Sequence, residues 1–341
     1  MATIHDIAKK SGVSVGTISN YLNSPDLLAD ATRERIQSAI DELGYYPKAA
    51  ARALKSRASK RVGIIPDSPS DVHSEGDPGD AAFQEYLSAV NLVAARRDFG
   101  LLLQASIDGQ GELDIYRKLV GEGQVDGMLL LGTTPDDDRV KFLLEKGFPF
   151  VTFGRTAVPG HKIWVDVDGN FGMQLAVDHL FSLGHRRIAW IPTPTDLFCH
   201  QDRLTGFQQA LQKHGLEDIS LYNVPGGFRE VHGQVAMHLL LDLPLPPTAV
   251  ITANDYAAFG AMNAIAQRGL LVGKDVSVIG FDDIRMSAHW TPSLTTVKQS
   301  MRQVGVTSME LLIDMIQNRP MTSHLIEPTL VVRRSTGPAA G

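Results

Sequence analysis

Residues 3–23 read TIHDIAKKSGVSVGTISNYLN, and this stretch predicts two short helices joined by a tight turn. Thr3 and Asp6 have the three-residue spacing of a capping box at a helix N-terminus. Gly12 permits the sharp turn of a helix-turn-helix unit, and Ser14 is a favourable cap for the second helix. Apolar residues at helical spacing give each helix an inward face, namely Ile4, Ile7 and Ala8 in the first helix and Ile18, Tyr21 and Leu22 in the second.

The second helix of this pair has a polar outer face that includes Thr17, Ser19 and Asn20. A short polar helix supported by so small a core suits a role in which its outer face docks into the major groove of DNA. The alternative interpretation is a helical cap on an enzyme. The turn residues and the charge pattern favour the DNA-binding interpretation.

A third helix is predicted within residues 31–47, which read ATRERIQSAIDELGYYP. Gly44 stands where this helix would end, and Pro47 closes the element. Residues 1–46 are therefore predicted to form a small three-helix headpiece. The apolar residues of the third helix follow i, i+3, i+4, i+7 spacing, at Ile36, Ala39, Ile40 and Leu43.

Charge divides the chain into a basic head and an acidic body. Residues 1–61 contain 10 lysines and arginines and 6 acidic residues, a net charge of +4, whereas the rest of the chain carries −10. The overall charge of −6 hides this division. Basic side chains on a small module suit contacts with phosphate groups, and an acidic body disfavours nonspecific spreading along nucleic acid.

From Val62 onward, short β-rich runs alternate with helical stretches. Helices are expected, among others, after Asp168 as far as Leu183, from Asp202, and up to Arg268. Apolar strands that alternate with helices predict parallel sheets covered by helices on both faces. The length and the two series of elements predict two lobes, with a ligand site between them beyond the carboxyl ends of the strands. The expected strands are VGIIP (62–66), LLLQAS (101–106), GMLLLG (127–132), FVTFG (150–154), RRIAWIP (186–192), AVIT (249–252) and VSVIGFD (276–282).

These motifs resemble the LacI/GalR family of bacterial transcription regulators over the length of the chain. The resemblance rests on TIHDIA (3–8), GVS (12–14), TIS (17–19), LN (22–23), TR (32–33), LGY (43–45) and ARALK (51–55). It implies an N-terminal all-α helix-turn-helix headpiece (1–46), a hinge helix or linker (47–60) and an α/β effector-binding and dimerisation domain (61–341).

The effector domain is expected to have two parallel-sheet lobes of the periplasmic-binding-protein-like type I fold. The resemblance implies that the chain crosses between the lobes near residues 164, 293 and 326. The expected lobe 1 therefore covers about 61–164 and 294–325, and the expected lobe 2 covers about 165–293 and 326–341.

The resemblance also assigns roles within the second helix. Val15 can contact a thymine methyl group, and Asn20 can form paired hydrogen bonds with adenine, whereas Gly16 presents no side chain. Many relatives carry arginine where Asn20 stands, so their operator sequences do not transfer. The hydroxyl groups of this helix suit phosphate contacts, the alternative being ordinary capping or solvation. The expected DNA-contact set is Thr3, Ser14, Val15, Gly16, Thr17, Ser19, Asn20, Asn23, Arg52, Leu54 and Lys55.

Residues 47–60 read PKAAARALKSRASK, which favours a helix but offers little apolar face to hold it in place. A flexible, solvated linker is the alternative. The resemblance implies a hinge helix that orders on DNA, with two copies in the minor groove of a pseudo-palindromic operator and Leu54 wedged between base steps. Such wedges kink the duplex at a cost of about a few kcal/mol per step, which added contacts offset.

The expected effector site lies at the strand ends. Arg203, in DRLTGF, matches the family arginine that reaches the ligand, and its planar fork can hold two oxygens. Asp282 ends a strand and can accept from ligand hydroxyl groups, and Asn254 follows the strand AVIT. The expected effector-binding set is Phe83, Arg155, Arg203, Phe228, Asn254, Asp282 and Trp290.

Structural alternatives stay open for several of these residues. Arg203 and Asp282 could pair with each other or with neighbours, and the three aromatic residues could serve ordinary packing. Asp255 and Asp283 are expected to cap helices or to bind backbone groups.

A sugar or sugar derivative is the predicted effector, because carboxylate, arginine and asparagine groups around an aromatic platform suit a polyhydroxylated ring. A purine corepressor is the main competitor, since Phe228 could stack on its ring. A solute-binding protein and an enzyme with a helical head are the other function classes. The missing signal peptide opposes the first, and the lack of a nucleophile or cofactor motif opposes the second.

The remaining features point to a cytoplasmic homodimer without a cofactor or metal. Cys199 is the only cysteine, which excludes an intrachain disulfide and suits a reducing compartment. No zinc-type spacing, signal segment or long apolar span appears, so membrane insertion is not expected. No heptad leucines follow the body, so a dimer, with contacts from the amphipathic helix at 301–317, is expected rather than a tetramer.

Residues 67–80 read DSPSDVHSEGDPGD and are longer than the usual family loop at this point. Their composition is typical of a mobile surface loop. A gating or selectivity role at the mouth of the cleft is the alternative.

Overall fold

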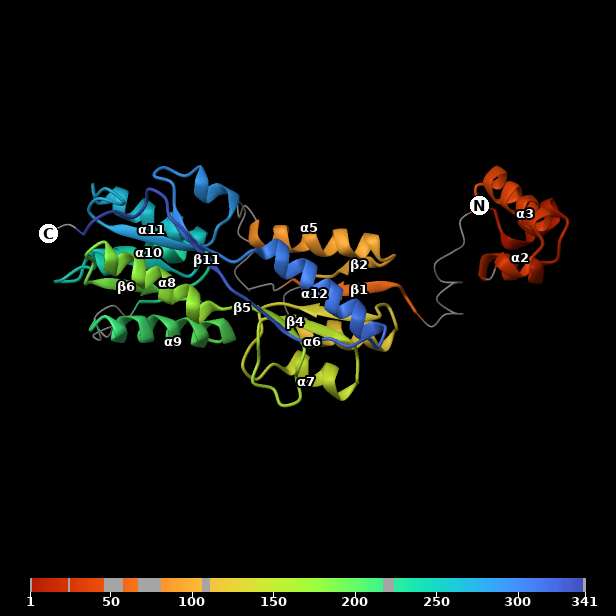
Figure 1. Cartoon of the computed structure of the whole chain (residues 1–341), viewed down its shortest axis with the longest axis horizontal. Helices are drawn as coiled ribbons and strands as arrows, with labels where there is room; N and C mark the ends of the chain where they lie inside the picture. The colour runs from red at the N-terminus through yellow and green to blue at the C-terminus, as the bar shows by residue number, and fades with distance from the viewer. Residues whose placement is uncertain are drawn as a thin grey trace. The chain divides into compact units, whose positions relative to one another are not determined.

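The chain forms two compact units, a head unit (Met1–Ser59) and a body (Lys60–Gly341). Figure 1 shows the computed structural model of both. The expected hinge contacts Arg52, Leu54 and Lys55 and the expected loop at 67–80 lie outside the residues that the structure describes. The described residues are 2–23, 25–45, 58–66, 81–105, 111–216 and 224–339.

The elements of the head unit are α1 (Ile4–Ser11), α2 (Val15–Asn23), a 3-10 turn η1 (Pro25–Leu27) and α3 (Asp30–Leu43). The expected capping box is confirmed, because the Asp6 N–H donates to Thr3 Oγ1 (3.4 Å) and the Thr3 N–H donates to the Asp6 carboxylate (2.8 Å). Gly12 (φ 70°) and Gly44 (φ 57°) end α1 and α3 in the left-handed region, which glycine adopts without strain. All three predicted helices are therefore confirmed.

The head unit has a small apolar core, whose buried members are Ile7, Ala8, Ile18, Ile36 and Ala39. Tyr21 and Leu22 pack against it from α2, as the helical spacing predicts. Among the described side chains of α2, Ile18 is the only fully buried one. The position of α2 on the other two helices therefore depends strongly on this residue.

Lobe 1 of the body is a six-stranded parallel sheet in the order β10-β5-β4-β3-β1-β2. Helices α5 and α12 pack together on one face of the sheet, and α6 and α7 cover the other face (Figure 1). Its elements are β1 (Arg61–Ile64), α5 (Ala81–Arg96), β2 (Gly100–Leu103), α6 (Glu112–Gly121), β3 (Gly127–Leu130), α7 (Asp138–Glu145), β4 (Phe150–Phe153), β5 (Trp164–Val167), α12 (Met301–Ile316) and β10 (His324–Ile326).

Lobe 2 is a five-stranded sheet in the order β11-β9-β8-β7-β6, in which only the β11–β9 pair is antiparallel. Helices α8 and α9 cover one face, and α10 and α11 cover the other. Its elements are α8 (Gly169–Ser182), β6 (Ile188–Ile191), α9 (Phe198–Lys213), α10 (Glu230–Leu241), β7 (Ala249–Thr252), α11 (Asp255–Gln267), β8 (Ser277–Asp282), η3 (Arg285–Ala288), β9 (Thr295–Lys298) and β11 (Thr329–Val331).

The chain crosses between the lobes three times, slightly later than expected for the first two crossings. β5 pairs with β4 in the first sheet, so the first crossing follows Val167 rather than residue 164. β9 pairs with β8 in the second sheet, so the second crossing follows Lys298 rather than residue 293. The third crossing lies between β10 and β11. Strand pairing, and not local composition, sets these boundaries.

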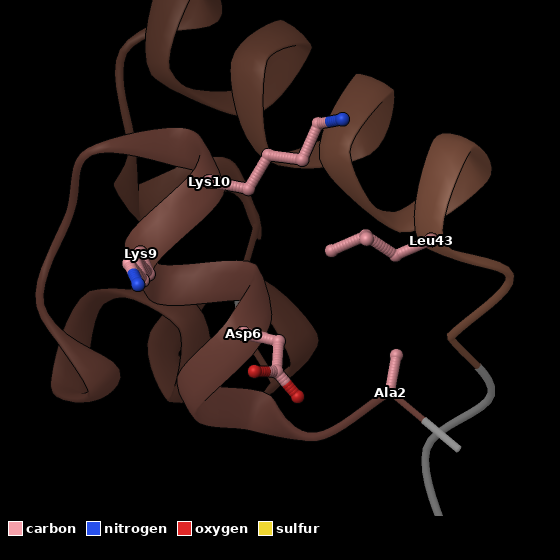
Figure 2. Close-up of a pocket in the computed structure, with 5 residues that line it drawn as sticks. All are labelled: Ala2, Asp6, Lys9, Lys10 and Leu43. Atoms are coloured by element: carbon pink, nitrogen blue, oxygen red, sulfur yellow. The ribbon is translucent and has the colours of Figure 1, made fainter.

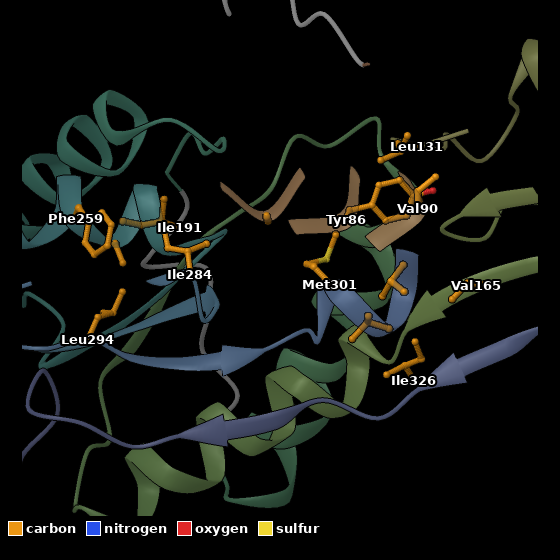
Figure 3. Packing of buried hydrophobic residues seen from close by; sticks show 14 of the residues in the cluster. Tyr86, Val90, Leu131, Val165, Ile191, Phe259, Ile284, Leu294, Met301 and Ile326 are labelled. Atoms are coloured by element: carbon orange, nitrogen blue, oxygen red, sulfur yellow. The ribbon is translucent and has the colours of Figure 1, made fainter. Parts of the chain in front are cut away.

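A buried apolar cluster draws residues from both lobes (Figure 3). Tyr86 and Val90 of α5 belong to it in lobe 1, and Phe259 of α11 belongs to it in lobe 2. Two further clusters fill the opposite faces of the two sheets. Both sheets are thus buried on both faces, which explains the nearly continuous apolar runs of their central strands.

The C-terminal segment after β11 is held to lobe 2 by a buried histidine. His185 is 2 % exposed, and its Nε2 lies 3.0 Å from the Gly337 carbonyl oxygen and 3.0 Å from Ser277 Oγ. Its Nδ1 lies 2.9 Å from Thr248 Oγ1. The imidazole therefore links the C-terminal segment to β8 and to the residue that precedes β7.

We expect His185 to contribute a loss in the free energy of unfolding of the body as the pH drops from 7 to 5. Burial lowers the pKa of His185 below its ordinary value of 6.5, with Gly337 opposing the shift and His179 adding to it. The unfolded chain then binds a proton near pH 6.5 that the folded chain still rejects, so stability is lost below that pH. Thermal unfolding across this range measures the effect.

His161 and His179 shift in the same direction through burial, whereas the raised pKa of Asp255 adds stability as the pH falls. His185→Gln should therefore lose less stability than the unaltered protein between pH 7 and 5. An unchanged slope in that variant would contradict the role given to His185.

Candidate functional site

The outer face of α2 carries the expected base-reading residues. Gly16 and Asn20 are exposed and lie one helical turn apart. Val15 is partly buried against the head core, so only part of its side chain remains for a partner. Asn23 is the last residue of α2. Of the three expected base-reading residues, Asn20 is therefore the one that presents an exposed polar side chain.

The hydroxyl groups near the start of α2 take part in its cap. Ser14 Oγ accepts the Thr17 N–H (3.0 Å) and lies 2.9 Å from Thr17 Oγ1. Thr3 is likewise engaged in the capping box of α1. In the free chain the Ser14 and Thr17 hydroxyl groups are thus engaged at the start of α2, and the Thr3 hydroxyl group at the start of α1. Ser19 is partly buried on the same helix.

An open depression of about 650 Å³ lies between α1 and α3 (Figure 2). Ala2, Asp6, Lys9, Lys10 and Leu43 line it. The Asp6 carboxylate is held in the capping box, and the Lys10 ammonium group is paired with Glu42. The lining includes no residue of α2, and of the expected DNA contacts only Thr3 adjoins it, through its hydrogen bonds with Asp6.

In the body, Arg203 gathers the expected effector residues of lobe 2. This α9 residue is 6 % exposed, and its Nη1 donates to the Ala253 carbonyl oxygen (2.7 Å). Its guanidinium carbon lies 3.6 Å from the centroid of the Phe281 ring. Because these two partners directly precede Asn254 and Asp282, all three expected polar residues meet at the carboxyl edge of the sheet.

Arg203 also carries a buried donor that the fold leaves open. Among the residues that the structure describes, no hydrogen-bond partner is found for its Nε atom. Buried polar groups nearly always have a partner, and arginine cannot lose its charge to avoid the problem. A buried arginine with an open donor is therefore suited to hold a ligand.

The other two polar residues are partly used by the fold. Asn254 Oδ1 accepts the Ala257 N–H (2.9 Å) and caps α11. Asp282 ends β8 with a φ of 125°, and its carboxylate accepts from Gln299 Nε2. Both still lie at the strand ends, where their remaining groups can contact a ligand.

Arg155 has partners that the sequence did not predict. Its Nε donates to Asp166 Oδ2 (2.7 Å) and its Nη2 donates to Asp202 Oδ2 (2.9 Å). Burial works against the charge, yet Asp166 and Asp202 raise the pKa of Arg155 above its ordinary value. Its guanidinium is therefore engaged with carboxylates from both lobes. The signals for these partners were weak, although Asp202 directly precedes Arg203 in the expected motif.

The expected aromatic residues divide between packing and the site. Phe83 stacks on Tyr86 (6.5 Å between ring centroids), and Trp290 stacks on Phe259 (4.2 Å). Both pack against the shared core, as the alternative interpretation allows. Phe228 is partly buried, and it follows Gly227, whose N–H donates to the Pro192 carbonyl oxygen just beyond β6 (2.8 Å). Phe228 is thus the aromatic residue tied to the polar edge of lobe 2.

Asp255 organises the same edge from inside. Its carboxylate is fully buried and accepts the Ile284 N–H (2.9 Å), the Ser287 hydroxyl (2.6 Å) and the Thr296 hydroxyl (2.5 Å). Burial raises the pKa of Asp255 to about 7, and these hydrogen bonds oppose the shift. The expected backbone contact of Asp255 is confirmed, and it fixes the segment after Asp282.

Within the described parts of the chain, no group of three or more His, Cys, Asp or Glu side chains is placed to hold a metal ion. None of the helices described is both long enough and apolar enough to span a membrane.

Two family models match the chain. Residues 3–48 match one described as "Bacterial regulatory proteins, lacI family". Residues 177–336 match one described as "Periplasmic binding protein-like domain". The first match covers the helices of the head unit, and the second lies within the body.

Solved structures match both units. The lac repressor dimer bound to operator and the anti-inducer ONPF has a TM-score of 0.84 at 26% identity, covering 98% of this chain and 99% of that chain. The complex of the regulator CelR with cellobiose has a TM-score of 0.75 at 30% identity, covering 98% and 100%.

Curated relatives match nearly the whole chain. The HTH-type transcriptional repressor CytR of Escherichia coli K12 is 33% identical over 340 residues, covering 98% of this chain and 96% of the relative. The HTH-type transcriptional repressor PurR of Erwinia tasmaniensis is 34% identical over 339 residues, covering 98% and 97%. With this identity and coverage, the chain belongs to the lacI family of bacterial regulatory proteins and is a DNA-binding transcriptional repressor.

Proposed function

We propose that a sugar bound at the carboxyl edges of the strands, between the two lobes, controls this repressor. The observation that carries the proposal is the open Nε donor of the buried Arg203, beside Asn254 and Asp282. Arginine and asparagine donate to hydroxyl oxygens, and a carboxylate accepts from hydroxyl groups. Phe228 offers an apolar ring surface next to them.

A comparison supports the sugar class, because CelR, whose fold this chain shares, was solved with cellobiose. A purine is the second candidate, since the ring of Phe228 could stack on a base. We further propose that the protein acts as a cytoplasmic homodimer, as the lac repressor dimer suggests, and that it has no enzymatic activity.

The proposed DNA complex places two head units on the half-sites of a pseudo-palindromic operator. Val15, Gly16 and Asn20 would face bases in the major groove, and the hinge segments would meet at the centre. A sugar that rotates one lobe of each subunit would change the separation of the hinges. By linkage, effector and operator then alter each other's affinity by the same factor, typically about 1–3 kcal/mol.

A thermal-shift screen of mono- and disaccharides, sugar phosphates and purines tests the effector class. A ligand present at about 100 times its dissociation constant adds about 2.7 kcal/mol of stability. A sugar hit that also changes operator affinity supports the proposal. Tight binding of hypoxanthine or guanine without any sugar binding would refute it.

We expect Leu54→Ala to weaken specific DNA binding by more than about tenfold and nonspecific binding far less, because the wedge kinks the operator and so permits the added contacts that offset an unstacking cost of about a few kcal/mol. Fluorescence anisotropy on operator and random duplexes measures both affinities. Lys55→Met is the matched control, since loss of one phosphate contact should weaken both and reduce the salt slope by about 1. Equal losses on the two DNAs in the Leu54 variant would eliminate the wedge role.

A further inference from the structure

An ion triad of Asp166, Arg155 and Asp202 connects the two lobes. Arg155 follows β4 in lobe 1 and is held there by Asp166 of β5 (2.7 Å). Its other edge pairs with Asp202 of α9 in lobe 2 (2.9 Å). Asp202 also accepts the N–H of Asn170 in α8 (3.1 Å), so each end of the triad is anchored in its own lobe.

A backbone hydrogen bond lies beside this ion triad and joins the same two segments. The Phe198 N–H, at the start of α9, donates to the Thr133 carbonyl oxygen of lobe 1 (2.9 Å). Thr133 Oγ1 in turn donates to the Arg155 carbonyl oxygen (2.7 Å). The Arg155 guanidinium carbon lies 5.4 Å from the Phe198 ring centroid. The first turn of α9 is thus held by two adjoining loops of lobe 1.

The triad is shielded enough from water for its ion pairs to contribute to holding the lobes together. The side chains of Arg155, Asp202 and Asp166 are 25%, 16% and 12% exposed. Solvent screens such a pair less than a surface pair, and arginine is the one cation whose planar fork can serve two carboxylates from separate edges. Separation of the lobes would leave these charges with fewer partners in a partly dry junction.

We propose that the Asp166–Arg155–Asp202 triad is an interlobe latch that the effector operates through α9. This inference rests on the proposed function, because the effector is placed on Arg203, the residue next to Asp202. Contacts made by Arg203 and by Asp202 lie on the same turn of one helix, so a ligand that shifts one residue shifts the other. One regulatory state keeps the Arg155–Asp202 pair, and the other state breaks it.

Cys199 provides a reporter for the latch in the intact chain. It is the only cysteine, it lies on the first turn of α9, and it is partly buried. Alkylation by iodoacetamide therefore labels one site, and its rate follows the population of the opened junction when closing is fast. We expect Asp202→Asn and Arg155→Met each to speed labelling about tenfold, equivalent to about 1.4 kcal/mol of opening free energy.

The two substitutions remove opposite charges near Cys199. Together they therefore distinguish an opening of the junction from a change in the pKa of the thiol. Burial raises the pKa of the Cys199 thiol, and Asp166 and Asp202 add to the shift while Arg203 opposes it. Without a latch, removal of the Asp202 charge would lower the thiol pKa and speed labelling, whereas removal of the Arg155 cation would not lower the thiol pKa and so would not speed labelling. Faster labelling in both variants supports the latch, and slower or unchanged labelling in Arg155→Met overturns it.

Asp178→Asn is the matched control, because Asp178 pairs with Lys213 (2.8 Å) and His214 (2.6 Å) within lobe 2. Its labelling rate should equal that of the unaltered protein. If Arg155→Met proves unable to fold, Arg155→Lys replaces it. This variant keeps the charge, and Cys199 should be labelled in it at an intermediate rate. The test uses no effector, so its failure leaves the sugar proposal standing. A failed sugar screen would remove the control of the latch by a sugar, and the labelling rates would still decide whether the triad holds the lobes together.

Discussion

Ile18→Ala is expected to abolish specific DNA binding while the body stays folded. Ile18 is fully buried in the head core, and truncation of such a residue to alanine costs about 2–5 kcal/mol through lost burial and a cavity. A core of so few residues rarely supplies more than about 3–5 kcal/mol in total. The head unit should therefore unfold, and α2 should lose the geometry that DNA recognition requires.

Calorimetry and DNA binding test this expectation together. The unfolding transition of the body should keep its temperature, because the body has apolar clusters of its own. Asn20→Ala is the matched control on the same helix, since it removes an exposed side chain, keeps the head folded and should reduce only sequence discrimination. Operator affinity within threefold of the unaltered value in Ile18→Ala would show that the head has another source of stability.

Arg203→Met is expected to lower effector affinity by about 100-fold or more. Each hydrogen bond from a charged group contributes about 1.5–3 kcal/mol, and the guanidinium fork can make two to a sugar. The apo body should remain folded, because among the described residues the side chain has one hydrogen bond, to Ala253, and methionine can keep contact with the Phe281 ring. Isothermal titration with a hit from the sugar screen measures the change.

Arg187→Gln is the control that separates a ligand contact from a general loss of arginine. Arg187 also donates to a backbone carbonyl oxygen in lobe 2, that of Pro246 (3.0 Å), but it precedes β6 at the opposite end of that strand. Its removal should leave effector affinity unchanged. Equal affinities for the effector in Arg203→Met and the unaltered protein would rule out the site at this edge.

Short-range signals predicted the head unit almost completely. The capping box of Thr3 and Asp6, the left-handed Gly12 and Gly44, and the helical spacing of the apolar residues all act within a few positions along the chain. The central strands of the body were predicted for a related reason. A strand buried on both faces is apolar throughout, and that property is visible in the sequence.

Peripheral elements were not predictable in this way. β5 (WVDV) and β9 (TTVK) mix polar and apolar residues, and their strand state depends on pairing with β4 and β8. Helix α9 begins at Phe198 rather than at the expected Asp202. The Phe198 N–H finds its acceptor in lobe 1, on Thr133, which no local signal reveals.

The sequence by itself determined the helix-turn-helix head, the parallel two-lobe body and the identity of the polar residues at the strand ends. Tertiary structure alone decided how those residues are used. It turned Arg155 toward Asp166 and Asp202, and it left Arg203 with an open donor beside Phe281. The physical reason is that capping and periodicity depend on near neighbours in the chain, whereas ion pairs and buried donors depend on segments that only folding brings together.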